Sequence, residues 1–265
     1  MFGVGVGIRV GGFTPISGGG GFDPDAQAFF DRVTTAGGTL TTTEKNATNQ
    51  LVLDMKSAGI WSSMKAIYPM VGASAAACAQ NLKSSSFTGT FTSGWTFAST
   101  GVTGNGTSTY FDTGLNVLSN LSTTSAHLGF YSRTNNIEST YDMCASENYA
   151  VLCYGNSFYV NLTNAGVYTA VVANANTTGF YIGSRTNNTN VNGYRNASKV
   201  INNAALVSNL VNNNVYLGAR GTATLSTTKQ YAFASIGDGL TDTQALNFYT
   251  AVQAFQTTLA RQIAP

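Results

Sequence analysis

Apolar and polar residues alternate in short runs between Phe87 and Ile236. Runs such as YAVLCYG, SFYVNLT and GFYIGSR place an apolar side chain at about every second position, and clusters of Asn, Gly and Ser separate them. A period of two is typical of strands with one buried face, and many such strands joined by polar turns are typical of an antiparallel sandwich or barrel. The pattern therefore predicts a mainly β domain over residues 73–265, with a helix at its C-terminal end.

Two helices are predicted ahead of these strands. Asp23 is placed as the N-cap of the first helix, with Pro24 at its first position and a Gly-Gly pair at its end. Thr41 and Glu44 have the spacing of a capping box, which opens the second helix. We expect the segment 23–72 to be helical and to pack on the β domain.

Two further stretches predict helix. IWSSMKAIYP, at 60–69, predicts one or two more helical turns before its proline. TDTQALNFYTAVQAFQTTLARQI predicts a terminal helix that Thr241 or Asp242 opens and that ends near Pro265. We expect this terminal helix to pack on the sandwich or on the N-terminal helices.

Residues 1–22 differ from the rest of the chain. Val, Gly and Ile alternate there before four consecutive glycines, which predicts a strand-like arm on a flexible linker. We expect the arm to dock onto another protein through the side chains that alternate along it: Phe2, Val4, Val6, Ile8 and Val10. The arm lacks the charged start and unbroken apolar core of a signal peptide, and no stretch reaches the roughly 18 apolar residues of a membrane span.

The composition narrows the choice of partners. Charged residues make up 9% of the 265 residues and the net charge is +2, while Asn, Thr, Ser and Gly supply the polarity. So small a net charge creates no global basic field, and nucleic acid is therefore not an expected partner. Cys78, Cys144 and Cys153 have no CxxC spacing, which argues against zinc or a disulfide framework and predicts buried free thiols.

The stretch SRTNN occurs twice, at 132–136 and at 184–188. A related Gly-x-Arg pattern occurs in YIGSR and YLGAR, so the recurring unit is a strand, a small residue, an arginine and a turn. Two interpretations remain open for Arg133, Arg185 and Arg220. Each arginine could cover apolar surface at a strand end and bond loop carbonyls, or the three could converge at one rim to bind an anionic sugar or the carboxylates of a partner.

Other side chains are candidates for binding. Trp95 and Tyr194 are predicted on strands or rims, where aromatic rings beside Asn and Arg donors suit a sugar-binding groove. Packing in the core or in an intersubunit contact is the alternative. Asp238 and Asp242 could offer two oxygens to calcium, although a turn and a helix start are the simpler explanation, and no cofactor is predicted.

Groups suited to catalysis are few. His127 is the only histidine, and without a GxSxG motif it is predicted to be an ordinary strand-surface residue. A retaining glycosidase needs two carboxylates about 5 Å apart. The nearest cluster has Glu138 and Asp142 four positions apart, with Glu147 in a predicted turn. The chain is therefore predicted not to be an enzyme, and Glu138 and Asp142 are the candidate residues if it hydrolyses glycosides.

Two resemblances add to this picture. The segment VYLGAR…QYAFASIGDGLTDTQALNFY, from Val215 to Tyr249, resembles the closing part of LamG-like members of the concanavalin A-like lectin and glucanase superfamily. This resemblance implies two facing antiparallel sheets in a jelly roll. A larger part of the chain, from DPDAQAFFDRV through SRTNN to TTLARQ, resembles uncharacterised proteins that bacteriophage genomes encode, commonly beside virion structural genes.

The resemblances and the scarcity of catalytic groups predict a non-enzymatic bacteriophage virion protein. It would be made in the host cytoplasm, form a homo-oligomer, and attach through residues 1–22 to the other virion proteins of a capsid, tail or fibre. One alternative is an adhesin on such a particle, which recognises host surface glycans with rim aromatics and arginines. The other is a glycoside hydrolase, which the spacing of the carboxylates disfavours.

Overall fold

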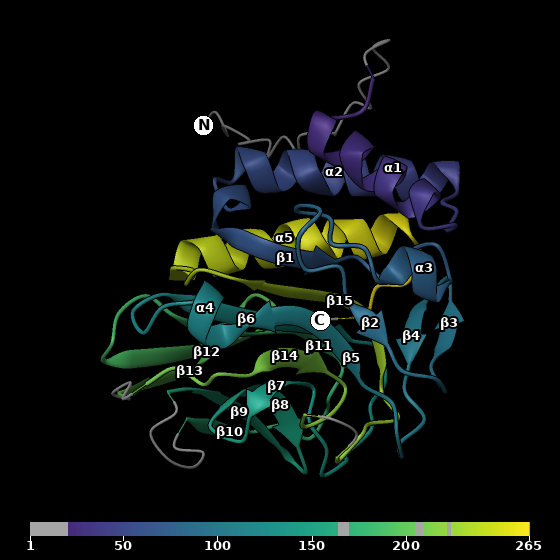
Figure 1. Cartoon of the computed structure of the whole chain (residues 1–265). Coiled ribbons are helices and arrows are strands. Elements are labelled where there is room, and N and C mark those ends of the chain that lie inside the picture. The colour runs from purple at the N-terminus through teal and green to yellow at the C-terminus, as the bar shows by residue number, and fades with distance from the viewer. Residues whose placement is uncertain (1–20, 164–169, 205–208, 222–223, 265) are drawn as a thin grey trace, which may run out of the picture.

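Two antiparallel sheets face each other in the computed structural model, which describes residues 21–163, 170–204, 209–221 and 224–264 (Figure 1). Within the described residues, sheet A has eight strands and sheet B has seven. Helices precede the strands and one helix follows them, so the predicted mainly β sandwich with N-terminal helices and a C-terminal helix is confirmed. The predicted docking side chains from Phe2 to Val10 lie outside the described residues.

The strand order shows how distant segments meet. Sheet A runs β13 (Ser198–Ala204), β12 (Asn190–Arg195), β11 (Gly179–Arg185), β6 (Ala126–Ser132), β15 (Gln230–Gly237), β4 (Gly101–Thr103) and β3 (Thr96–Ala98), and β1 (Met64–Tyr68) pairs with β15. Sheet B runs β10 (Val171–Ala173), β9 (Ser157–Leu162), β8 (Tyr149–Tyr154), β7 (Met143–Ser146), β14 (Asn214–Leu217), β5 (Phe111–Asn116) and β2 (Thr90–Phe91).

The longer helices begin where their capping residues predict. The helices are α1 (Pro24–Thr35), α2 (Thr42–Ser57), α3 (Ala75–Cys78), α4 (Val117–Asn120) and α5 (Asp242–Thr258). Asp23 caps α1, and Thr41 and Glu44 close the predicted capping box on α2. Thr241 caps α5 in the same way, but the helix ends well before the predicted end near Pro265.

One predicted helical stretch is a strand. Within IWSSMKAIYP only residues 61–63 form a single 3₁₀ turn, and β1 follows at once, paired with β15. β1 lies at the edge of sheet A under the helices, so four of its five residues are buried and it has no alternation by which a strand is recognised. The stretch GYRNASKV forms the hairpin between β12 and β13, and Asn196 turns it with a φ of 53°.

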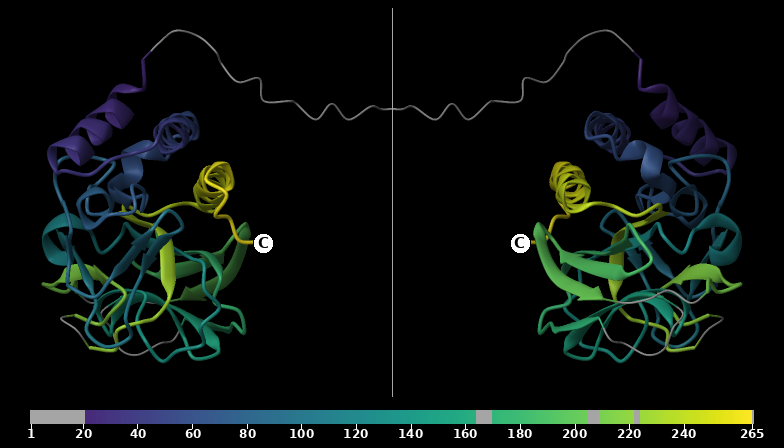
Figure 2. Two further views of the ribbon diagram at one scale, coloured as in Figure 1. Left: turned by 90° about the vertical axis from the view of Figure 1, so that its right-hand side faces the viewer. Right: turned by 90° about the vertical axis from the view of Figure 1, so that its left-hand side faces the viewer.

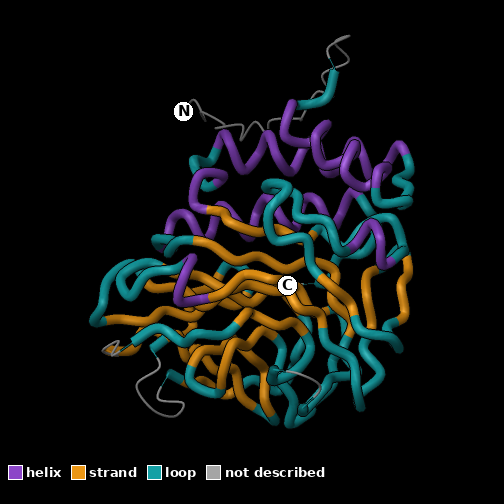
Figure 3. The backbone as a smooth tube through the Cα atoms, viewed as in Figure 1, coloured by secondary structure: helices purple, strands orange, loops and turns teal. Residues whose placement is uncertain are grey.

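The interior has two layers. Between the sheets, inward side chains of β8 such as Tyr149, Val151 and Cys153 pack against sheet A. On the other side of sheet A, Phe180 and Phe233 pack against Phe248 and the rest of α5. Figures 2 and 3 show α1, α2 and α5 together on that side of the molecule. Sheet A is therefore covered on both faces, whereas the outer face of sheet B points away from the helices.

The small residue of the recurring unit has a packing role in β11. A Cβ atom on Gly183 would lie 2.4 Å from a methyl group of Val151 and 2.7 Å from one of Val160, both on sheet B. Such distances are well inside van der Waals contact, so glycine allows the two sheets to approach here. The close approach explains the glycine of YIGSR without a ligand.

Two further predictions can be compared with the structure. Cys78, Cys144 and Cys153 are buried free thiols, as predicted. Among the helices of the described residues, none is both long enough and apolar enough to cross a membrane.

Candidate functional site

The predicted arginines do not share a rim. β6 and β11 are antiparallel, with Gly179 opposite Ser132 and Arg185 opposite Ala126. Arg133, which follows β6, and Arg185, which ends β11, therefore lie at opposite ends of sheet A. Arg220 follows β14 in the other sheet. Of the two open interpretations, the one in which the three arginines converge is wrong, because equivalent positions on antiparallel neighbours point to opposite ends of a sheet.

Two of the arginines bond the chain itself. The Arg133 Nε donates to the Arg261 carbonyl oxygen at 2.7 Å, and its Nη1 donates to the Gln230 side chain. The Arg185 side chain is fully buried and its Nη1 donates to the Thr123 carbonyl oxygen at 3.1 Å. Burial lowers the pKa of both guanidinium groups. Both side chains follow the first interpretation, in which a strand-end arginine bonds loop carbonyls.

The two aromatic candidates are also internal. Trp95 is buried and its Nε1 donates to the Tyr110 carbonyl oxygen at 3.2 Å. Tyr194 is buried under α5, and its hydroxyl donates to Asp242 at 2.7 Å. Neither ring is available as an exposed sugar platform, so the packing alternative describes both.

The candidate carboxylates are held by the chain. Asp142 is fully buried and pairs with Lys229 at 3.1 Å. Burial alone would raise the pKa of Glu138, but hydrogen bonds from Thr228 and Thr227 outweigh it and lower that pKa. A general acid needs a raised pKa, so Glu138 does not suit the role.

The two carboxylates considered for calcium have separate cationic partners. Asp238 pairs with Lys65 at 3.2 Å and Asp242 pairs with Lys199 at 2.9 Å. Hydrogen bonds from Tyr194 and Lys199 lower the pKa of Asp242. No group of three or more His, Cys, Asp or Glu side chains that could hold a metal ion occurs within the described residues.

His127 is buried rather than on the strand surface, which corrects the expectation. Its ring packs against Phe248 of α5, and its Nδ1 lies 2.6 Å from the Asp238 carbonyl oxygen. A carbonyl only accepts, so Nδ1 carries the proton. Burial lowers the pKa of His127 to about 4, and the hydrogen bond to Asp238 offsets only part of that effect.

The buried imidazole predicts a loss of stability in mild acid. Between pH 6.5 and pH 4 the unfolded chain binds a proton at His127 that the folded chain does not bind, so the free energy of unfolding falls as the pH falls. We expect a loss of about 2 kcal/mol between pH 7 and pH 5. Urea unfolding at several pH values measures it. In His127→Gln this slope should be largely flattened, and an unchanged slope in that variant would assign it to other groups.

Aromatic side chains lie on the outer face of sheet B, outside the core between the two sheets. Ala150, Leu152 and Tyr154 point outward from β8 and form a separate cluster with Tyr141, Cys144 and Tyr159. On β14, Tyr216 lies between the core residues Val215 and Leu217, so it also points outward. We call this surface the tyrosine face and define it by its five aromatic members: Tyr110, Tyr141, Tyr154, Tyr159 and Tyr216.

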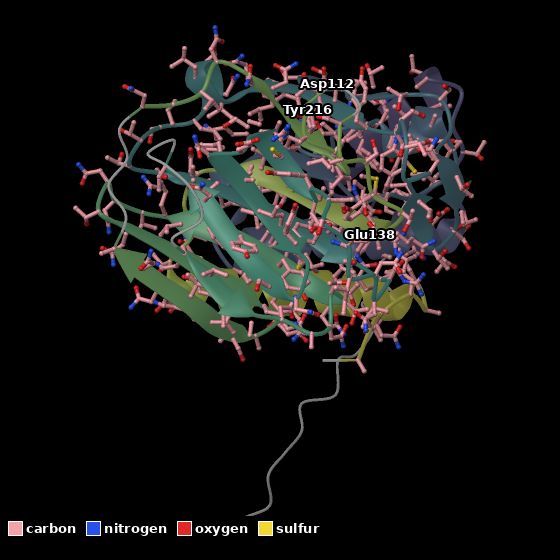
Figure 4. The ribbon with its side chains drawn as sticks, turned by 90° about the horizontal axis from the view of Figure 1, so that it is seen from below. Asp112, Glu138 and Tyr216 are labelled. Atoms are coloured by element: carbon pink, nitrogen blue, oxygen red, sulfur yellow. The ribbon has the colours of Figure 1, made fainter. Side chains whose placement is uncertain are left out.

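A continuous row of paired residues crosses the tyrosine face. From β2 to β9 the row consists of Thr90, Asp112, Tyr216, Cys144, Ala150 and Asn161, each opposite the next. Figure 4 looks onto this side of the molecule: Asp112 and Tyr216 lie side by side, and Glu138 lies apart from them. The row places a carboxylate next to an aromatic ring on neighbouring strands.

The β5 and β14 part of the face combines rings with hydrogen-bonding groups. The rings of Tyr110 and Tyr216 meet edge to face with centroids 5.7 Å apart. Asn214 donates to Asp112 at 3.0 Å, which fixes the carboxylate beside Tyr216. Burial and the Asp112 charge raise the pKa of Tyr216, so its hydroxyl stays protonated and can donate to a ligand.

The β7 to β10 part of the face is more apolar. Tyr141 and Tyr154 meet edge to face with centroids 6.2 Å apart. Tyr159 lies between Leu152 of β8 and Val171 of β10, and the Val171 side chain is largely exposed. Tyr141 is buried, whereas Tyr154 and Tyr159 are half-buried, and together with the exposed Val171 these two rings form a surface on which the apolar side of a ligand can rest.

Arg220 completes the face. Its guanidinium forms an ion pair with Glu147 and lies 5.8 Å from the centre of the Tyr141 ring. Of the five residues predicted for binding, Arg220 is the one that the structure places on the tyrosine face. Tyr159, Tyr216 and Asp112 were not predicted, although the inward Phe158 and Val160 already place Tyr159 on the outward side of its strand.

Comparison with known proteins identifies the fold. No protein-family model matches the chain and no curated protein matches it. Among solved structures, the botulinum neurotoxin serotype D binding domain has a TM-score of 0.50 at 9% identity, over 72% of this chain and 52% of that chain. A mutant Trypanosoma rangeli sialidase that displays trans-sialidase activity also has a TM-score of 0.50, at 6% identity, over 78% of this chain and 39% of that chain.

The match to a third structure covers nearly the whole of that structure's chain. Domain 4 of AbnA, an extracellular arabinanase from Geobacillus stearothermophilus in complex with arabinotriose, has a TM-score of 0.45 at 12% identity, over 70% of this chain and 98% of that domain. The chain thus spans about half or less of the toxin and sialidase chains that it resembles. The fold is a concanavalin A-like antiparallel sandwich, as the LamG-like segment implied.

Proposed function

We propose that this protein is a non-catalytic carbohydrate-binding protein that holds a glycan on the tyrosine face. One observation carries the proposal. The outer face of sheet B points away from the helices, and half-exposed tyrosine rings lie on it beside Asp112, Asn214 and Arg220. Binding sites combine an aromatic surface with a few placed polar groups, and this face does so.

The chemistry of a sugar ring suits this surface. A pyranose presents apolar C–H groups on its faces and hydroxyl groups at its edge, so it can lie on a tyrosine while its edge forms hydrogen bonds. Tyr159 and Tyr216 supply two rings on strands three places apart in sheet B, and Asp112 supplies an acceptor next to Tyr216. Tyrosine also loses little side-chain entropy on binding because it has only two rotatable angles.

The fold is compatible with binding sugars. The Trypanosoma rangeli sialidase, which shares it at a TM-score of 0.50, is named for an activity on sugars. We infer a binding rather than a catalytic role for this chain because Glu138, Asp142 and His127 are held by internal hydrogen bonds. A surface that only binds needs no general acid or nucleophile.

The virion role remains a prediction from the bacteriophage resemblance. A glycan-binding face is compatible with it, because an adhesin on a particle needs one surface for the particle and another for the host. The arm that would attach to other virion proteins, at residues 1–22, is separate in sequence from the strands of the tyrosine face. Homo-oligomer formation likewise remains a prediction.

A glycan array tests the proposal. The purified protein should bind one class of glycan above background, and Tyr159→Ala and Tyr216→Ala should each weaken that binding about tenfold, which is about 1.4 kcal/mol. Each variant removes a half-exposed ring, so the folded structure should persist. Titration calorimetry with the best array glycan measures the loss.

Tyr249→Ala provides the matched control. Tyr249 is also half-exposed, but it lies on α5, where it lines a hollow of about 350 Å³ together with Arg195 and Asn196. Binding should be unchanged in this variant. If Tyr249→Ala lost binding while both face variants kept it, the glycan would lie beside α5 and the tyrosine face would be the wrong site. An array with no glycan above background would refute the function itself.

A further inference from the structure

The Arg220 and Glu147 side chains meet on the tyrosine face from two different segments. Glu147 lies in the two-residue turn between β7 and β8, since Ser146 and Tyr149 are paired. Arg220 follows β14, which pairs with β7. Their ion pair therefore lies over β7, the central strand of the tyrosine face. The Arg220 charge also acts on the Cys144 thiol of β7, where it opposes the rise in the Cys144 pKa that burial causes.

Arg220 differs from the buried arginines in what its guanidinium contacts. Arg185 and Arg261 are buried and donate to backbone carbonyl oxygens, which are fixed parts of the fold. Arg220 pairs with a side chain, Glu147, and its exposed fraction is 35% against 52% for Glu147. A carboxylate side chain on a turn can rotate into solvent, whereas a backbone carbonyl cannot.

The exposed pair is easily opened. Ion pairs between solvent-exposed side chains contribute little to stability, because water screens the charges and two long side chains must be held in one geometry. A ligand that already lies on neighbouring tyrosines brings its own carboxylate to Arg220 without that cost. A carboxylate can then accept two parallel hydrogen bonds from the guanidinium.

The surroundings orient the guanidinium toward such a ligand. The Arg220 Cζ lies 5.8 Å from the centre of the Tyr141 ring, and a cation–π contact with a tyrosine restricts the orientation of the guanidinium plane. Tyr154 packs edge to face on Tyr141, with centroids 6.2 Å apart, and it is half-exposed. A sugar ring placed on Tyr154 would therefore lie close to the Arg220 guanidinium group.

We propose that Arg220 is an anion subsite of the tyrosine face, that it takes the carboxylate of an acidic sugar, and that Glu147 occupies this subsite when no ligand is bound. The proposal rests on the proposed function and names the class of glycan. Glu147 is then an internal competitor, so its removal should strengthen the binding of an acidic sugar. A merely structural ion pair would have no such effect.

Matched pairs of acidic and neutral oligosaccharides test the proposal. One pair of probes is a galacturonate trimer and its methyl ester, and the other pair is sialyllactose and lactose. Sulfated lactose is added to distinguish recognition of a carboxylate from recognition of a sulfate. The wild-type protein should bind at least one carboxylated member about tenfold more tightly than its neutral partner. Raising the salt concentration should reduce this preference, because the guanidinium is partly exposed.

Three variants test which residue causes the preference for the acidic sugar. Arg220→Gln should abolish it, because the acidic sugar should lose far more affinity than the neutral sugar. Glu147→Gln should tighten the binding of the acidic sugar about threefold or more. Arg195→Gln is the matched control, because its guanidinium also lies 5.8 Å from a tyrosine ring, that of Tyr181, but belongs to sheet A. This control should change neither affinity.

The possible outcomes distinguish a failure of the Arg220 subsite from a failure of the proposed function. Neutral sugar bound on the face without any acidic preference would overturn the Arg220 subsite and leave the proposed function standing. Equal losses for acidic and neutral sugar in Arg220→Gln, or an unchanged acidic affinity in Glu147→Gln, would also overturn it. Sulfated lactose bound more tightly than every carboxylated probe would refute the carboxylate assignment. No binding of any probe or array glycan would refute the proposed function as well. Equal thermal midpoints for the variants and the wild type confirm that each is folded.

Discussion

Lys229→Met is expected to lower the free energy of unfolding by about 3–5 kcal/mol, because it leaves the charge of Asp142 buried without its cation. Both side chains are fully buried, and the Lys229 Nζ lies 3.1 Å from each oxygen of Asp142. Asp142 also accepts from the Tyr231 hydroxyl at 2.6 Å and from the Cys153 amide at 2.7 Å. Tyr231 belongs to sheet A and Cys153 to sheet B, so the ion pair joins the two sheets.

Chemical denaturation measures this loss, and a double variant tests its cause. Asp142→Asn combined with Lys229→Met removes both charges. The amide oxygen can still accept from the Cys153 amide, and the amide NH2 can donate to the Tyr231 hydroxyl oxygen. The double variant should be more stable than Lys229→Met alone, with a coupling energy of about 1–3 kcal/mol in the double-mutant cycle. Simple additivity of the two single changes would mean that the buried charge of Asp142 is not the reason for the loss.

Arg261→Met is expected to cost a similar amount, about 3–5 kcal/mol, through lost hydrogen bonds rather than a lost ion pair. The buried guanidinium donates to the carbonyl oxygens of Pro69, Met70 and Ala232 at 2.6–2.9 Å. These contacts join the chain after α5 to the end of β1 and to β15. Burial lowers the pKa of Arg261 to about 10, so the group is charged at neutral pH and each bond is charge-assisted.

Differential scanning calorimetry measures the effect of Arg261→Met. A loss of this size should lower the melting temperature by roughly 10 °C in a chain of this length. Gln262→Ala is the control, because Gln262 is the exposed next residue and its removal should leave the midpoint unchanged. A midpoint in Arg261→Met that equals the wild type would show that water replaces the guanidinium without cost.

Local patterns predict many of the elements of this fold. Asp23, Thr41 and Glu44 mark helix starts through hydrogen bonds between near neighbours in sequence, so the sequence alone contains the needed information. β1 does not follow from such a pattern. It pairs with β15, which is distant in sequence, and it lies under the helices, so Met64 to Tyr68 shows no alternation.

The SRTNN repeat shows how a true local similarity misleads about a site. Both copies end a strand, but the strands are antiparallel neighbours, so the two arginines lie at opposite ends of one sheet. The direction of a neighbouring strand is a property of topology and not of the repeated residues. Arg261, which is more deeply involved in the packing, lies in no repeat and was not predicted.

The tyrosine face could be predicted only in part. Alternation with Phe158 and Val160 already places Tyr159 on the outward side of its strand, and similar alternation places Phe180 on the outward side of β11. The helices cover Phe180 and not Tyr159. Which sheet receives the helices depends on long-range packing, so the sequence pattern does not show which of the two rings the helices cover.

The most direct test of the account is to map which backbone amides respond to a bound glycan. Amide chemical shifts of the protein, recorded with increasing amounts of the best array glycan, should change on β5, β7, β8, β9 and β14, around Asp112, Tyr159 and Tyr216. The helices and the strands of sheet A should remain unaffected. Shifts that cluster on α5 and the hairpin of β12 and β13 instead would contradict the assignment of the tyrosine face as the binding site.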